Sequence, residues 1–288
     1  MLWAVFGMCW RWSCVMALAL LGCSGTRGTL LVLGAGGAGG TGNDGGSAGA
    51  GPKMTWVPAV DVSWQVQLSG NVDTTLAVQM FYVDADLVPA ATRGVIHDSG
   101  RAIACYLSVG SFEPWRSDAA SFPSAVIGNP LSDYPREQWV DIRSPDLRAI
   151  IQKRIVALAA DHCDGIVPAN LEGNLNDTGF SLTGDDEHAY ALWLNDQVHA
   201  SGMSLALSLD EGLVKGLMAD FDWALAFECV VDGCPGYGAM SQTGKAVLGV
   251  EYGNASTAPG ICAKIKGYGL NGLIKNRALD GFRIACNQ

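Results

Sequence analysis

Basic side chains are scarce in this sequence. Its 288 residues include 18 Lys and Arg against 28 Asp and Glu, which gives a formal net charge of -10. The few basic residues are scattered along the chain, whereas binding to nucleic acid or to an anionic membrane surface requires clustered Lys and Arg. We therefore exclude nucleic acid as a partner. The acidity is explained by solubility alone, and it also suits a neutral or cationic ligand.

Residue spacings typical of metal and nucleotide sites are missing as well. No two cysteines have CxxC spacing, and no two of the four histidines have ligand spacing, which argues against zinc. No glycine-rich nucleotide-binding motif or phosphate loop follows any of the apolar runs described below. We expect neither a metal nor a cofactor.

The N-terminal apolar run is too short to span a bilayer. It follows Arg11, covers residues 15–21 and is followed by Gly22 and Cys23, whereas a membrane helix needs about 20 apolar residues. This pattern is typical of an export signal. Residues 20–23, LLGC, also resemble the lipobox of bacterial lipoproteins, which implies lipid attachment at Cys23 and a location on the cell envelope. Plain secretion after a nearby cleavage is the alternative.

Glycine dominates the next stretch. Residues 34–52, GAGGAGGTGNDGGSAGAGP, contain almost nothing to bury, as expected of a flexible tether. The sequence therefore divides into an export signal (1–23), a tether (24–53) and one folded domain (54–288), which is long enough for a sizeable core. We expect this domain to be a monomer.

Six of the nine cysteines lie in the folded domain. An even number of cysteines in an exported chain favours disulfides. Cys229 and Cys234 flank a glycine-containing turn, so we expect them to pair, and Cys262 with Cys286 is the second expected pair. Cys105 sits inside an apolar strand, where a cysteine is commonly a buried thiol.

Apolar runs of strand length recur along the domain, separated mostly by segments with helical periodicity. Ser144 and Pro145 can start one helix, and Thr183 with Asp186 resembles a capping box at the start of another. Apolar strands joined by helices indicate a parallel sheet, and the count of eight favours a closed (β/α)8 TIM barrel over an open sheet. The eight runs begin at Ser63, Val78, Ala102, Gly165, Ser204, Trp223, Ala246 and Gly272.

Several longer motifs occur in order between Trp56 and about Lys275. They are WQVQLSG (64–70), CYLSVGSFEPWRSDA (105–119), FP (122–123), WVDIR (139–143), NDTGFSLT (176–183) and GKAVLGVEY (244–252). Together they resemble glycoside hydrolase family 114. The resemblance implies a (β/α)8 barrel and, as the type activity, endo-α-1,4-polygalactosaminidase. It also implies polysaccharide containing galactosamine as the partner.

The two carboxylates that this resemblance implies are missing. Glycosidases typically need a pair of acids, one to protonate the leaving oxygen and one to act at the anomeric carbon or on water. The family pattern D-G-V-E-P-D-N is DGIVPAN (164–170), which puts Ala169 at the catalytic aspartate, and N-E-x-C is AFEC (226–229), which puts Phe227 at the glutamate. The family's K-N-D is SLD (208–210). We interpret six positions as one pocket that has lost its polar groups: Val167, Ala169, Ser208, Leu209, Ala226 and Phe227.

Other acids near strand ends are weak replacements. Glu228 lies one residue beyond the expected glutamate, and one step along a strand turns the side chain to the opposite face. Asp210 and Glu251 occupy plausible strand ends. These three residues are the fallback candidates for catalysis.

Some of the same positions are candidates for holding a sugar without cleaving it. Trp115, on a loop after a strand, can stack on a sugar ring. Asp84 and Tyr106 lie toward strand ends, although either can equally be a structural group. The candidate substrate-binding residues are Asp84, Tyr106, Trp115, Asp210 and Glu251.

The sequence therefore favours an exported, lipid-anchored barrel of this family whose catalytic centre has degenerated, leaving a carbohydrate-binding or scaffold role. Two alternatives stay open. The first is an active glycosidase on galactosamine-containing polysaccharide that uses a rebuilt acid pair. The second is a surface interaction protein without a glycan ligand.

Overall fold

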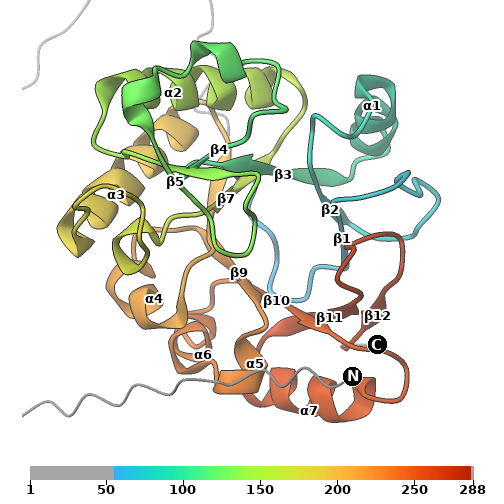
Figure 1. Ribbon diagram of the computed structural model, residues 1–288. Helices are drawn as coiled ribbons and strands as arrows, with labels where there is room; N and C mark the ends of the chain where they lie inside the picture. The colour runs from blue at the N-terminus through green and yellow to red at the C-terminus, as the bar shows by residue number, and fades with distance from the viewer. Residues whose placement is uncertain (1–54, 287–288) are drawn as a thin grey trace, which may run out of the picture. The chain divides into compact units, whose positions relative to one another are not determined.

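The computed structural model describes residues 55–286, in which one sheet contains all eight expected strands (Figure 1). Neighbouring strands pair in parallel from β1 through β11. Each strand falls on one of the predicted apolar runs, so the (β/α)8 fold class is confirmed. The strands are β1 (Trp64–Gln67), β2 (Met80–Val83), β3 (Ala102–Ser108), β7 (Gly165–Ala169), β8 (Ser204–Leu207), β9 (Trp223–Phe227), β10 (Val247–Tyr252) and β11 (Asn271–Lys275).

The interior of the barrel is filled by side chains from all eight strands. Because side chains alternate along a strand, every second residue points inward. Two features lie where the first and last strands of the barrel meet. The short strand β12 (Ile284–Ala285) pairs antiparallel with β11, and Trp64 Nε1 of β1 donates to Asn271 Oδ1 of β11 over 3.3 Å. One buried cluster includes Trp64, Tyr82, Ala104, Val167, Ala206, Leu225, Val250 and Leu273.

The helices cover the outer face of these strands (Figure 1). A second buried cluster joins strand residues such as Ile103 to helix residues such as Leu147 and Leu194. The predicted helix starts are confirmed, since Ser144 caps one helix and Thr183 forms a capping box with Asp186. The helices are α1 (Ala90–Asp98), α2 (Pro145–Ala160), α3 (Gly184–Ala200), α4 (Glu211–Leu217), α5 (Cys229–Asp232), α6 (Pro235–Ser241) and α7 (Ala258–Gly267).

A small antiparallel sheet is inserted between β3 and α2. Its strands are β4 (Ser111–Phe112), β6 (Gln138–Val140) and β5 (Ile127–Pro130), in that spatial order. Single 3-10 turns lie at Ala119–Ser121, Ser124–Val126 and Gly173–Leu175. The insertion follows the carboxyl end of β3 and therefore lies on the side of the barrel where catalytic residues stand in this fold.

Three disulfides join the cysteines of the domain. The predicted pairs Cys229–Cys234 and Cys262–Cys286 are both present. The expectation of a free buried thiol at Cys105 is wrong, because Cys105 is bonded to Cys163 with the Cα atoms 5.9 Å apart. After α2 the chain returns to β7, which pairs with β3. Cys163 lies two residues before the start of β7.

The export signal, the lipid attachment at Cys23 and the tether fall outside the described residues. No helix within residues 55–286 is long and apolar enough to cross a bilayer.

Candidate functional site

The carboxyl ends of the barrel strands form a mouth at which β7 ends with Ala169 and β9 ends with Phe227. Val167 belongs to the interior cluster, and Ala169, two residues further on, shares its face. Phe227 packs against the same cluster. Neither side chain can give or take a proton, so the two positions expected to carry an acid pair have no titratable group.

The six positions interpreted as one pocket divide between two faces of the barrel. Val167 and Phe227 lie with the interior cluster, as expected. Ala226 and Leu209 instead lie in or against the outer cluster, beneath the helices. The interpretation of a single pocket is wrong for these two residues. Ala226 is adjacent to Phe227 in β9 and therefore points to the opposite face, and Leu209 lies beyond the end of β8 and packs against the outer cluster.

Glu228 lies at the rim of the mouth, where the backbone turns sharply after β9. Its φ of 51° is in the left-handed region, and its Oε1 accepts from Arg277 Nη2 over 2.8 Å. The guanidinium of Arg277 also lies 4.6 Å from the centre of the Tyr252 ring. This carboxylate therefore forms an exposed ion pair with a residue of the loop after β11.

The other two fallback acids have structural partners. Asp210 precedes α4 and accepts from Gly212 N over 2.8 Å, which caps that helix. Glu251 is buried, accepts from Val230 N over 2.9 Å, and has its pKa raised by that burial. Because its neighbour Val250 belongs to the interior cluster, Glu251 faces outward toward α5.

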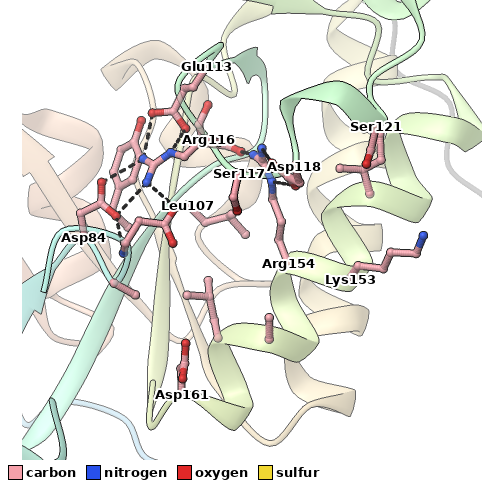
Figure 2. A pocket seen from close by; sticks show the side chains of 17 residues that line it. Asp84, Leu107, Glu113, Arg116, Ser117, Asp118, Ser121, Lys153, Arg154 and Asp161 are labelled. Carbon is pink, nitrogen blue, oxygen red and sulfur yellow. Dashed lines mark hydrogen bonds and ion pairs between the residues drawn. The ribbon is translucent and has the colours of Figure 1, made fainter. Parts of the chain in front are cut away.

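A cavity of about 300 Å³ lies beside the mouth, between the ends of β2 and β3, the loop after β4, and α2. Two of the predicted substrate-binding residues, Asp84 and Tyr106, line it. Figure 2 shows Arg116 between the carboxylates of Asp84 and Glu113. It donates to both Asp84 oxygens over 3.0 and 2.9 Å, and to Glu113 over 2.7 and 2.9 Å. Asp84 and Glu113 are thus both paired with Arg116, which fixes the positions of the three side chains.

The opposite wall of the cavity comes from α2 and carries a second ion pair. Arg154 donates to both oxygens of Asp118 over 2.7 Å, and this hydrogen bonding lowers the pKa of Asp118. Lys153 of α2 also lines the cavity, as do Ser117 and Ser121 of the loop after β4 (Figure 2) and the apolar side chains of Ile150, Ala157 and Leu158. Hydroxyl, ammonium, guanidinium and carboxylate groups together offer many hydrogen bonds to a polar, hydroxyl-rich ligand.

Trp115 does not line this cavity, but its side chain is accessible. It is 47% exposed, and the guanidinium of Arg136 lies 5.1 Å from its ring centre. Both residues belong to the insertion after β3. Stacking of a sugar ring on Trp115 stays a prediction.

The sequence analysis missed the polar residues that organise this side of the mouth. Glu113 and Arg116 belong to the motif at residues 105–119, but no local sequence pattern predicts that Arg116 reaches the end of β2. Glu137 is also buried, with its pKa raised by burial, and accepts from Ser111 Oγ over 2.6 Å. Asn170 Nδ2 donates to the same Ser111 oxygen over 2.9 Å, which ties the residue beside Ala169 to the insertion.

The described part of the chain contains no group of three or more His, Cys, Asp or Glu side chains arranged to hold a metal ion.

A barrel of eight parallel strands, with a cavity that reaches the ends of β2 and β3, defines the class of (β/α)8 proteins with a site at the carboxyl face. Within that class, the model of glycoside-hydrolase family GH114 matches residues 46–288. The chain belongs to this family. No curated protein matches it.

Two solved structures are similar to the chain over most of its length. The crystal structure of Aspergillus fumigatus Ega3 in complex with galactosamine is 28% identical, with a TM-score of 0.76, and the match covers 81% of this chain and 98% of that one. The glycoside hydrolase domain of PelA from Pseudomonas aeruginosa is 14% identical, with a TM-score of 0.62, and the match covers 77% and 98%. At that identity the likeness to PelA supports the fold alone.

Proposed function

We propose that this protein binds galactosamine-containing polysaccharide without hydrolysing it. The observation that carries the proposal is the pair of side chains at the mouth, Ala169 and Phe227, where a family resemblance implies an aspartate and a glutamate. General acid catalysis alone typically contributes about 10²- to 10⁴-fold in rate. With neither carboxylate in place, both roles of a glycosidase acid pair are lost together.

Retention of a polar site supports binding over complete loss of function. Asp84 and Tyr106 line a cavity that is rich in hydrogen-bonding groups, and Trp115 presents an exposed aromatic face. The similar Ega3 structure contains galactosamine. The net charge of -10 also favours a polymer whose amino groups are protonated.

A hydrolase with a rebuilt acid pair has less support from the geometry. Asp210 caps α4, Glu251 faces α5, and Glu228 pairs with Arg277. Recruiting any of them requires breaking an existing interaction. A surface protein without a glycan ligand is also less supported. In such a protein we expect both Leu209 and Phe227 to plug the barrel mouth, whereas only Phe227 packs against the interior cluster and Leu209 packs against the outer one.

Export, with lipid attachment at Cys23, completes the proposal. Three disulfides in one domain favour an oxidising compartment. The glycine-rich residues 34–52 suit a domain held away from a membrane surface.

Binding and hydrolysis of an α-1,4-linked galactosamine polymer, measured on one preparation, test the proposal. We expect binding without release of reducing ends. Trp115→Ala should weaken binding by about three- to tenfold, as loss of one stacking contact does. Leu192→Ala, which removes a partly exposed apolar side chain from α3, is the matched control and should bind normally. Absence of any binding by the wild type would refute the carbohydrate-binding role.

A further inference from the structure

Two tyrosine hydroxyls from different sides of the barrel lie near each other at its mouth. Tyr82 of β2 belongs to the interior cluster, and Tyr252, the last residue of β10, packs against the same cluster. Tyr252, Tyr106 and Asp84 all act electrostatically on the Tyr82 phenol. Because these three groups lie toward the carboxyl ends of their strands, the Tyr82 hydroxyl points toward the mouth.

The hydroxyl of Tyr82 forms no hydrogen bond within the described part of the chain, although the residue is only 2% exposed. Its oxygen is nevertheless not one of the fully enclosed polar atoms of the domain, so it borders accessible space. The Tyr252 hydroxyl is likewise without a partner in residues 55–286 and borders accessible space. Both hydroxyls can therefore be reached from the mouth.

Buried tyrosines of the outer layer have partners within the protein. Tyr190 donates to Val109 O over 2.9 Å, and Tyr237 donates to Leu209 O over 2.8 Å. Both lie in the outer cluster, beneath the helices. A buried tyrosine hydroxyl usually has a partner, and one left without a partner is costly. The free hydroxyl of Tyr82 is therefore suited to a partner from outside the chain.

The surroundings of these hydroxyls are neutral or charge-paired. Ala169 and Phe227 carry no charge, and the carboxylates of Asp84 and Glu228 are each paired with an arginine. Burial raises the pKa of Tyr82 well above its ordinary value, so the hydroxyl keeps its proton and can donate as well as accept. Neutral hydroxyls beside aromatic rings suit the hydroxyl groups of a sugar.

We infer that Tyr82 and Tyr252 form a monosaccharide-binding site inside the mouth, where their hydroxyls hydrogen-bond to hydroxyl groups of one hexosamine residue. The choice of a hexosamine rests on the function proposed above. Tyr106, which acts on Tyr82, also lines the cavity beside the mouth, so a chain in that cavity can place one residue at this site. Tyr82 determines specificity, because a site that hydrogen-bonds a hydroxyl rejects an analogue lacking it.

NMR of the full chain with ¹³C-labelled tyrosine rings tests the inference directly, with Tyr→Phe variants assigning the signals. Galactosamine is the probe, and its titration should shift the ring signals of Tyr82 and Tyr252. The signals of Tyr190 and Tyr237, whose hydroxyls are bonded to the backbone, should not move. Cyclohexylamine has a six-membered ring and an ammonium group but no hydroxyl, and it should bind at least about tenfold more weakly.

Variants that lose one hydroxyl and keep the ring separate binding from folding. Tyr82→Phe and Tyr252→Phe should each weaken galactosamine binding by about three- to tenfold, as loss of one neutral hydrogen bond does. Both should unfold at the urea concentration of the wild type, because no contact within the protein is lost. Tyr268→Phe, at a position that packs against the outer cluster, is the matched control and should bind normally.

The outcomes distinguish this inference from the function proposed above. Polymer binding by the wild type, with unshifted Tyr82 signals or with normal galactosamine affinity in Tyr82→Phe, would overturn the inference alone. Equal binding of cyclohexylamine, or a lower urea midpoint in Tyr82→Phe, would also overturn it. A wild type that binds galactosamine at Tyr82 but does not bind the polymer would support the site and refute the proposed function. Binding of neither would overturn both.

Discussion

The buried carboxyl of Glu187 should make the stability of this protein fall as the pH rises. Burial, reinforced by the field of Glu172, raises the pKa of Glu187 from 4.5 to about 7. An acid whose pKa is raised by folding binds its proton more tightly in the native state than in the unfolded one. Ionisation of Glu187 therefore does not lower the free energy of unfolding below pH 4.5. It lowers this free energy progressively between pH 4.5 and about 7, and by the full amount above that.

The size of this penalty follows from the two pKa values. At about 1.4 kcal/mol per pH unit, the difference between 4.5 and about 7 corresponds to about 3 kcal/mol. Little of this is lost to solvent screening, because the side chain is only 5% exposed. In Glu187→Gln the side chain keeps an oxygen that accepts from Asn174 N, and it cannot ionise. The variant should therefore not lose stability as the pH rises.

Urea denaturation at pH 5 and pH 8 measures the effect as a difference between proteins. Glu187→Gln should be close to the wild type at pH 5 and more stable by up to about 3 kcal/mol at pH 8. Asp185→Asn, at an exposed position in the first turn of α3, should have the stability of the wild type at both pH values. Other buried acids titrate in all three proteins and cancel in the comparison. If Glu187→Gln is equally or less stable than the wild type at pH 8, the reasoning about this carboxyl is refuted.

Three further predictions concern other parts of the chain. Arg116→Met should lower the free energy of unfolding by about 3–5 kcal/mol, because it leaves two buried carboxylates unpaired; a loss below about 1 kcal/mol by urea denaturation would show that the network is not stabilising. Replacing both cysteines of the Cys105–Cys163 bridge, with a sequence separation of 58, should cost roughly 4 kcal/mol, against about 2 for the short bridge after β9, and the reverse order would contradict the chain-entropy argument. Cys23→Ser should move the protein from the membrane to the soluble fraction and remove the acyl mass, whereas a wild type that is already soluble and unmodified would exclude lipidation.

Most of the barrel could be predicted from local sequence patterns. Each strand is a short apolar run bounded by turn residues, and the starts of α2 and α3 carry capping side chains whose spacing is local. The small sheet β4-β6-β5 was missed, because its strands are only two to four residues long and too short for a period to show. The Cys105–Cys163 bridge was missed for a different reason, since it depends on which strands become neighbours.

The candidate site was predictable only in part. The residues at the ends of β7 and β9 follow from a family resemblance and from strand alternation. The ion pair between Arg116 and Asp84 joins residues 32 positions apart, and no periodicity encodes it. Glu251 was placed correctly at a strand end, but its direction depends on which face of β10 is buried inside. Glu187 gave no signal, because its burial depends on how α3 packs against the Gly173–Leu175 turn.

Hydrolysis of an α-1,4-linked galactosamine polymer by the wild-type protein is the most direct test of the central claim. Release of reducing ends is measured on a preparation that binds the polymer. We predict no release above a buffer control, because Ala169 and Phe227 occupy the places of the two acids. Turnover by the wild type that disappears in Asp210→Asn or Glu228→Gln would contradict the account and establish a rebuilt catalytic centre.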